Sequence, residues 1–170
     1  MGGERETTLR GLVGLSIEPA NEPPHHLVLK LGVRRLRCSL ELDHPDFGMD
    51  GRLDGIFTLN CWLALLERLS TGSDPVVLLG YDFSDQYSGW LRVGPVHAGS
   101  VEVQPGVSGF ADYQLELSDL LDPHRRIHDF QPDDAPGIVR PLADIVAQVA
   151  AARDALAKRR ATEDDDVQAD

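Results

Sequence analysis

A chain of 170 residues, 42% hydrophobic and 26% charged, has the size and composition of one ordinary globular domain, which argues against wholesale disorder. The net charge is −12, from 16 basic and 28 acidic residues, and it disfavours nucleic acids and anionic membranes as partners because like charges repel phosphate. The two cysteines, Cys38 and Cys61, each lie inside an apolar segment, so we predict neither a disulfide framework nor a CxxC metal site.

The sequence has no targeting or membrane signal. The first residues, MGGERETTLRGL, contain no apolar leader segment, and no run of about 18 apolar residues occurs. A myristoylation pattern would need Ser or Thr where the chain has Glu6. We therefore expect a cytoplasmic, soluble protein with a single globular domain over residues 1–160. The acidic tail, residues 161–170, has too few apolar residues to fold and is predicted to be disordered.

Charge is unevenly distributed along the chain. Residues 1–40 hold six basic and four acidic residues, a balance of +2. Residues 74–134 hold eleven acidic residues against three arginines, a balance of −8. A one-sided acidic field is what a protein that captures a basic partner would present.

The first third of the chain reads as strands. Residues 9–18 alternate between apolar and polar side chains, as a half-buried strand does. Residues 27–33 and 36–42 are apolar on opposite parities, so a turn or bulge must lie at residues 32–35. We predict a hairpin, with one bulged strand as the alternative.

Residues 57–81 form the most hydrophobic stretch. We predict a helix that begins after an N-cap at Thr58, with Phe57 and Trp62 as a hydrophobic staple and Gly72 just beyond its last turn. Its apolar stripe is wide enough to predict a helix covered on most sides. Residues 76–79 are apolar on both parities, as in a strand covered on both faces.

Three more alternating strands are predicted at residues 90–93, 101–104 and 110–118. The pairs Gly94-Pro95, Pro105-Gly106 and Ser108-Gly109 punctuate them at the spacing of an antiparallel meander. A last amphipathic helix is predicted at residues 141–159. The predicted fold class is therefore α+β: a mainly antiparallel sheet of about seven or eight strands, sandwich-like or strongly curved, with one central buried helix and a C-terminal amphipathic helix.

Sequence motifs for catalysis and metal binding are absent. The sequence has neither GxGxxG nor GxxxxGK[ST], and Phe110 stands where a GxSxG elbow needs its second glycine. The acidic loop 43–54 does not have the ligand spacing of a calcium loop. His124 and His128 would share a face on a helix, but HEXXH needs glutamate in place of Arg125. We predict no metal, no cofactor and no catalytic residue.

Candidate binding residues come from the acidic middle of the chain. In the predicted strand 110–118, Asp112 and Glu116 point away from the apolar face, and Glu102 is close in sequence. Asp82 and Asp85 lie in the loop that follows the double-faced strand. We therefore predict an acidic sheet face that binds a partner, formed by Asp82, Asp85, Glu102, Asp112 and Glu116.

The order of elements resembles that of WapI-type immunity proteins and of related small β-rich bacterial domains of unknown function. The matching segments are GRLDGIFTL, the helix CWLALLERL, a glycine turn, GWLRV and YQLELSDL, and the resemblance covers residues 28–121. It implies a protein that neutralises a toxin by binding it, and it carries no individual residue roles.

Three hypotheses follow. The leading one is a non-enzymatic cytoplasmic binding protein, an immunity protein that masks a basic toxin domain. The second is a small-molecule-binding or hydrolytic domain with a pocket between helix and sheet, walled by Trp62, Trp90 or Tyr81. The third is a subunit of a larger assembly that docks through the helix at residues 141–159. The sequence leaves the oligomeric state open.

Overall fold

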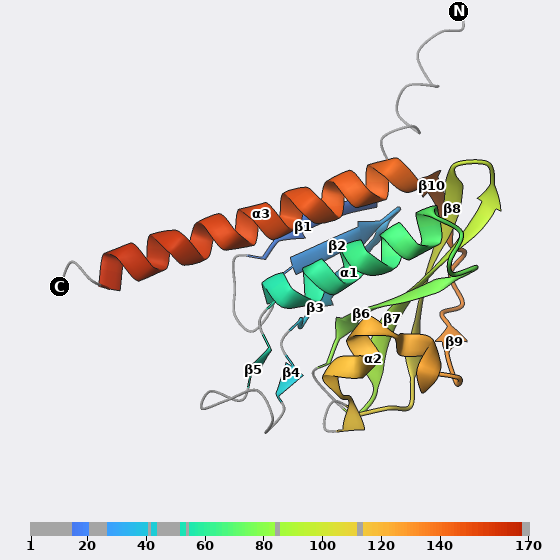
Figure 1. Ribbon diagram of the computed structural model, residues 1–170, viewed down its shortest axis with the longest axis horizontal. Coiled ribbons are helices and arrows are strands. Elements are labelled where there is room, and N and C mark those ends of the chain that lie inside the picture. The colour runs from blue at the N-terminus through green and yellow to red at the C-terminus, as the bar shows by residue number, and fades with distance from the viewer. Residues whose placement is uncertain are drawn as a thin grey trace, which may run out of the picture.

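The computed structural model describes residues 15–20, 27–40, 42–43, 52–53, 55–83, 86–111 and 114–167. Within these residues the chain has an α+β fold with two main antiparallel sheets, of three and five strands, and helices packed on them (Figure 1). The predicted fold class is confirmed. No helix in the described part of the chain is long and apolar enough to cross a membrane.

The smaller sheet has the order β1-β2-β3, with β1 at Leu15–Pro19, β2 at Leu27–Leu31 and β3 at Arg34–Cys38. Strands β2 and β3 form the predicted hairpin, because Leu31 pairs with Arg34 across a two-residue turn. Gly32 takes a φ of 62° in this turn, a conformation that glycine adopts without steric cost. Residues 9–14 of the first predicted strand lie outside the described residues.

The larger sheet has the order β10-β8-β7-β6, with β9 also paired to β8. Its strands are β6 at Val77–Asp82, β7 at Ser88–His97, β8 at Ser100–Ser108, β9 at Gln131–Pro132 and β10 at Ile138–Pro141. Strands β7 and β8 run through Gly94-Pro95 and Pro105-Gly106, which the sequence analysis takes as strand ends, so that part of the prediction is wrong.

The two sheets meet where β3 ends beside β6. Ser39 forms a parallel bridge with Asp82, and the amide of Phe83 donates a hydrogen bond of 3.2 Å to the carbonyl of Ser39. A short two-stranded ladder joins β4, Leu42–Asp43, to β5, Arg52–Leu53, just before the first helix.

Helix α1, Gly55–Ser70, is buried on most sides, as predicted. Its predicted start is wrong, because the helix begins three residues before Thr58. Thr58 is therefore not the N-cap of α1. Its hydroxyl donates to the carbonyl of Leu40 at 2.9 Å inside the core. The end is as predicted, since Gly72 takes a φ of 74° just beyond the helix.

Helix α3, Leu142–Val167, packs against α1, β1 and β10 and projects beyond the body of the molecule (Figure 1). It begins after Pro141, which belongs to β10, and continues to Val167, past the predicted end at residue 159 and into the segment for which we predict disorder. Residues 168–170 lie outside the described residues.

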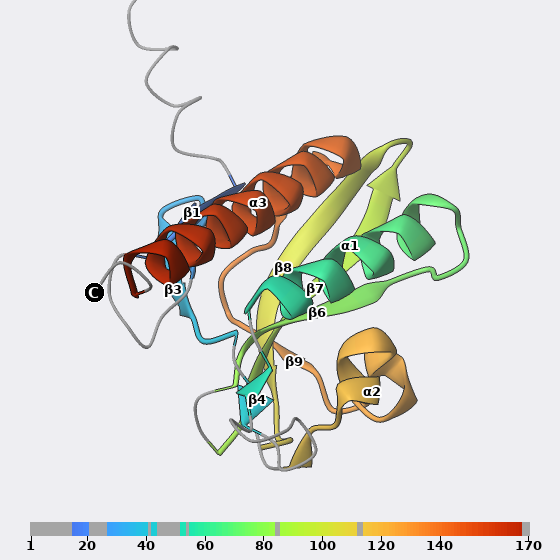
Figure 2. The ribbon, with the colours of Figure 1, turned by 60° about the vertical axis from the view of Figure 1, so that its left-hand side comes forward.

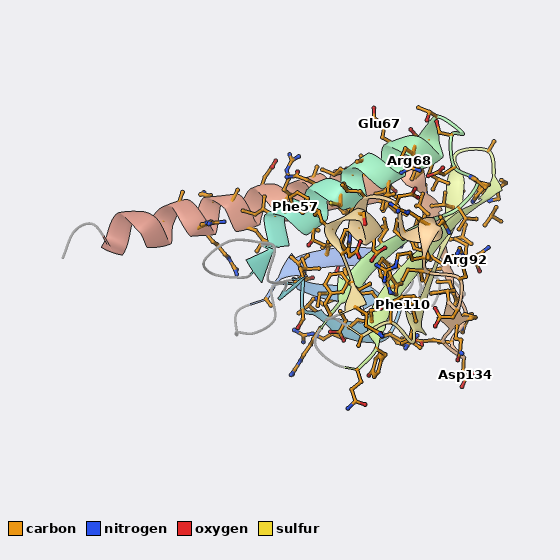
Figure 3. The ribbon with its side chains drawn as sticks, turned by 60° about the horizontal axis from the view of Figure 1, so that its bottom comes forward. Phe57, Glu67, Arg68, Arg92, Phe110 and Asp134 are labelled. Atoms are coloured by element: carbon orange, nitrogen blue, oxygen red, sulfur yellow. The ribbon has the colours of Figure 1, made fainter. Side chains whose placement is uncertain are left out.

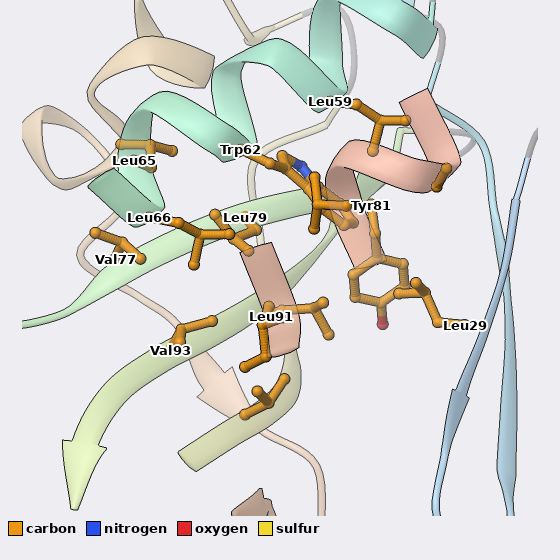
Figure 4. Packing of buried hydrophobic residues seen from close by; sticks show 14 of the residues in the cluster. Leu29, Leu59, Trp62, Leu65, Leu66, Val77, Leu79, Tyr81, Leu91 and Val93 are labelled. Atoms are coloured by element: carbon orange, nitrogen blue, oxygen red, sulfur yellow. The ribbon is translucent and has the colours of Figure 1, made fainter. Parts of the chain in front are cut away.

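The main core lies between the two helices α1 and α3 and one face of each sheet. Trp62 and Leu66 of α1 point toward Leu79 of β6, and Tyr81 lies beside Leu29 of β2 (Figure 4). The Trp62 indole N–H donates to the carbonyl of Gly80 at 2.9 Å, which ties α1 to β6. The core therefore includes the double-faced strand that the sequence analysis predicts at residues 76–79.

Residues 110–111 and 114–118, the described part of the predicted strand 110–118, do not form a strand. After β8 the chain turns, with the Gln114 amide donating to the Ala111 carbonyl at 3.0 Å, and helix α2 then spans Leu117–Leu121. The Asp119 carboxylate accepts a hydrogen bond of 2.8 Å from the Glu116 amide and so stabilises the first turn. Asp112 lies outside the described residues. A turn and a short helix replace the predicted acidic strand.

Candidate functional site

The candidate site lies on the face of the five-stranded sheet that points away from α1, which we call the outer face. Side chains alternate along β7, so Trp90 and Arg92 both lie on this face, next to each other. Trp90 is fully buried, whereas Arg92 is exposed. The outer face therefore has a covered half around Trp90 and an open half around Arg92.

The covered half is built by residues 110–111 and 114–130, which pack over β6 and β7. In Figure 2, α1 and α2 lie on opposite sides of β6. The Trp90 indole N–H donates to the Ser88 hydroxyl at 2.7 Å, and its ring meets Phe83 edge-on at 6.0 Å between centroids. This second core contains, among its buried side chains, Cys61, Leu78, Phe83, Trp90, Leu115, Leu120 and Ile127.

The open half contains a shallow groove of about 470 Å³, which we call the β8 groove. Its walls come from β7, β8 and the segment around β9. Figure 3 shows Arg92 and Asp134 at the end of the molecule away from the projecting end of α3. The lining residues are Arg92, Glu102, Gln104, Phe130, Pro132, Asp133 and Ala135.

The groove exists because two short strands share one edge of β8. Strand β10 pairs with Ser100 to Val103, and β9 pairs with Gly106 and Val107, so the chain between them, residues 133–137, leaves the ladder beside Gln104. The Gln104 side-chain amide donates to the carbonyls of Asp133 at 3.2 Å and Ala135 at 2.9 Å. Gln104 thus fixes the segment that forms one wall.

A second contact ties this wall to the smaller sheet. The Arg34 guanidinium at the start of β3 forms an ion pair with the Asp133 carboxylate, and both side chains are about one-third exposed or less. The remaining terminal nitrogen of Arg34, Nη1, is buried and has no hydrogen-bond partner among the described residues. Burial raises the pKa of nearby Tyr81, and the charges of Asp133 and Asp82 raise it further.

The carboxylates of the two halves differ in whether other residues of the chain bind them. Over the covered half, Asp119 lies 2.8 Å from Arg126, and Glu116 lies 3.4 Å from the same guanidinium. Asp129 accepts hydrogen bonds from the Ser108 hydroxyl and the Gly109 amide. Burial alone would raise the pKa of Asp129, but these hydrogen bonds outweigh it and hold the pKa below its usual value.

Beside the β8 groove, the carboxylates of Glu102 and Asp134 have no ion pair or hydrogen bond to any residue that the structure describes. The Arg92 guanidinium likewise has no partner within the described ranges. Val139, which pairs with Glu102 across β8 and β10, is 47% exposed. The open half therefore presents unengaged charge next to an exposed apolar side chain.

The structure describes three of the five predicted binding residues, Asp82, Glu102 and Glu116, and it does not gather these three into one cluster. Asp82 pairs with Gly89 and Glu102 pairs with Gly94, so they stand five residues apart along β7, roughly 17 Å at 3.4 Å per residue. Glu116 lies at the start of α2 rather than on a strand. Asp85 and Asp112 lie outside the described residues. Of the three predicted residues that the structure describes, only Glu102 lines the groove.

The histidine and cysteine candidates offer no nucleophile or metal site in the described part of the chain. His124 lies in η3, a 3-10 turn at Pro123–Arg125, and its Nε2 is 2.8 Å from the Val76 carbonyl; His128 follows after this turn has ended. No group of three or more potential metal ligands gathers among the described residues. Burial raises the pKa of Cys38, and it raises that of Cys61 to about 12, so both thiols stay protonated and unreactive.

The aromatic side chains proposed as pocket walls do not line the groove. Trp62 and Trp90 are 1% and 0% exposed, and Tyr81 is 7% exposed. Sequence reasoning missed Arg92, Gln104 and Asp133 because Pro105-Gly106 reads as a turn. The alternation of Arg92 with Leu91 and Val93, and of Gln104 with Val103, was the available sign that both side chains share one face.

Comparison of the chain with known protein families, with curated proteins and with solved structures gives no match.

Proposed function

We propose that this chain is a non-enzymatic cytoplasmic binding protein that holds a basic protein partner on the open half of its outer sheet face. In its most specific form the partner is a toxin domain and the chain is its immunity protein. The observation that carries the proposal is the contrast between engaged carboxylates over the covered half and unengaged ones, Glu102 and Asp134, beside the β8 groove.

Charge supports a basic partner. The net charge of −12 attracts a cationic surface over a distance of about one Debye length, roughly 8 Å at physiological salt. At the surface itself, Glu102 and Asp134 offer acceptors for lysine or arginine, and Val139 offers apolar contact area. Arg92 sets a requirement for specificity, because a partner must place a carboxylate or carbonyl opposite it.

Small-molecule binding is the less well supported candidate. The groove is shallow, and the aromatic side chains expected to wall a pocket lie in the two cores. Docking through α3 has similarly little support, since Ile145, Val149 and Ala152 on this helix are already buried within the chain.

Co-expression with the product of the adjacent gene tests the proposal. We expect the two proteins to co-purify, and we expect co-expression to relieve any toxicity of that product. If the neighbouring protein co-purifies but is not toxic, binding stands and the immunity form fails. If it neither co-purifies nor is neutralised, the proposal is wrong in both forms.

A matched pair of variants locates the surface. In Glu102→Lys/Asp134→Lys, two attractive charges become repulsive, and we expect co-purification to be lost. In Arg92→Gln, a positive charge is removed from the same groove, and retention should be equal or stronger. Weaker retention of both variants would show that the partner does not select negative charge.

A further inference from the structure

A second charged surface lies on the three-stranded sheet, and its sign is opposite to that of the whole protein. Residues 27–40 contain four basic residues and no acidic one. The alternation in β2 and β3 places Leu29, Leu36 and Cys38 toward the helices. The face that points away from α1 and α3 carries Lys30, Arg35 and Arg37, and we call it the basic hairpin face.

The three cations lie close together. Lys30 is directly opposite Arg35 in the β2–β3 register, a distance of about 5 Å between Cβ atoms. Arg37 follows Arg35 two residues later on the same face, about 7 Å along the strand. Arg35 and Arg37 are exposed. Alongside the hydrogen bond from Lys30, the charge of Arg35 helps to lower the pKa of Glu18. The Arg37 guanidinium has no partner among the described residues.

This arrangement costs stability within the chain. Like charges directly opposite each other in a sheet are destabilising. One carboxylate, Glu18, lies on this face and binds Lys30 at 2.7 Å, and that hydrogen bond lowers the pKa of Glu18. This single negative charge is shared by Lys30 and Arg35, so the three cations keep a net positive charge on this face. A planar guanidinium with free donors is suited to carboxylate recognition from outside the chain.

We propose that the basic hairpin face is a second interaction surface, and that its partner is a short acidic segment of another protein. The spacing fits an extended segment with carboxylates at alternate positions, because its side chains on one face repeat at the same 7 Å interval, about the distance from Arg35 to Arg37. Arg35 and Arg37 each take one carboxylate, and Lys30 widens the cationic field.

The size of the patch selects against extended polyanions. A duplex or a membrane would cover more than the roughly 7 Å patch and would meet the acidic surface of a protein that carries −12 overall. A short segment stays within the reach of the three cations. This inference is independent of the proposed binding of a basic partner at the β8 groove.

Fluorescence anisotropy with a short labelled peptide of alternating glutamate and threonine tests the proposal. We expect binding that weakens as salt rises, and that is at least about tenfold weaker in Arg35→Glu/Arg37→Glu. The matched control is Arg125→Glu, which reverses an exposed arginine of η3, outside both proposed binding surfaces, and should leave the affinity unchanged. A peptide of alternating lysine and threonine should not bind.

Other outcomes would overturn the proposal. One is equal loss of binding in the Arg125 variant, which would indicate non-specific attraction. Another is tighter binding to phosphatidylserine vesicles or to single-stranded DNA, which would indicate a phosphate ligand. Self-association that needs Arg35 and Arg37 in sedimentation would assign the face to a second copy. If circular dichroism shows that the double charge reversal unfolds the chain, Arg35→Gln/Arg37→Gln gives the same comparison. Absence of peptide binding to the wild-type chain refutes the proposal outright.

Discussion

Trp90 and Arg92 are neighbours on the same face of the same strand, yet they lie in different environments. Trp90 is covered by side chains from residues 114–130 and is fully buried, whereas Arg92 faces an open groove. Carboxylates near Trp90 are held by an arginine or a hydroxyl group. Near Arg92, Asp133 is paired with Arg34, but Glu102 and Asp134 have no partner among the described residues. One sheet face thus serves stability in one half and offers unengaged groups for binding in the other.

Removing the Trp90 side chain is the strongest test of the difference between the covered and the open half. We expect Trp90→Ala to lower the free energy of unfolding by about 3–5 kcal/mol, because it leaves a large cavity and removes the hydrogen bond to Ser88. Arg92→Ala should change it by less than about 0.5 kcal/mol. Denaturant unfolding of both variants checks this, and similar losses would contradict the division into halves.

The second-largest loss of stability is expected at Gly106, a glycine at the border between the two halves. A Cβ at Gly106 would lie 2.3 Å from the backbone carbonyl of Gln131 and 2.6 Å from the Phe130 ring, so β9 would have to move. We expect Gly106→Ala to cost about 1–3 kcal/mol, as overpacking of a core does.

Gly137→Ala is the matched control for that substitution. The three atoms nearest to its Cβ belong to the side chains of Glu102 and Gln104 rather than to the backbone. We expect a loss below about 1 kcal/mol, but a larger change in binding at the β8 groove, since both side chains line it. Thermal unfolding of the two variants in parallel measures the difference, and an equal loss in both would contradict it.

The smallest effect concerns pH. The depressed pKa of Asp129 means that this group stabilises the folded chain above its unfolded pKa, and that the contribution is lost as pH falls through the folded pKa. Asp129→Asn removes this titration. We expect the variant to be less stable at neutral pH and to lose less stability on acidification than the parent, measured as melting temperature against pH. Parallel curves for the two proteins would count against the hydrogen bonds at Ser108 and Gly109 as its cause.

Much of the fold follows from local pattern. Helix α1 and the hairpin were predictable because their apolar periodicity and their glycines fit only one type of secondary structure each. Strand β6 was predictable as a strand covered on both faces because its odd- and even-numbered positions are both apolar. The C-terminal helix was predicted in kind but not in length.

The errors have physical causes in long-range contacts. Residues 110–118 alternate as a strand would, but Leu115 and Leu120 are held under the outer face by the second core, and Asp119 stabilises a helix start instead. Gly106 is needed inside β8 because Gln131 and Phe130, far along the chain, press against it. The open half of the site depends on the gap between β9 and β10, which no local pattern encodes.

The central claim is that binding uses the open half of the outer face. It is tested most directly by the affinity of the chain for its co-expressed partner after charge reversal at two places. Glu102→Lys/Asp134→Lys, beside the groove, should weaken the complex at least about tenfold, whereas Glu116→Lys, over the covered half, should leave it nearly unchanged. A complex that is weakened by Glu116→Lys and indifferent to the groove variant would contradict the account.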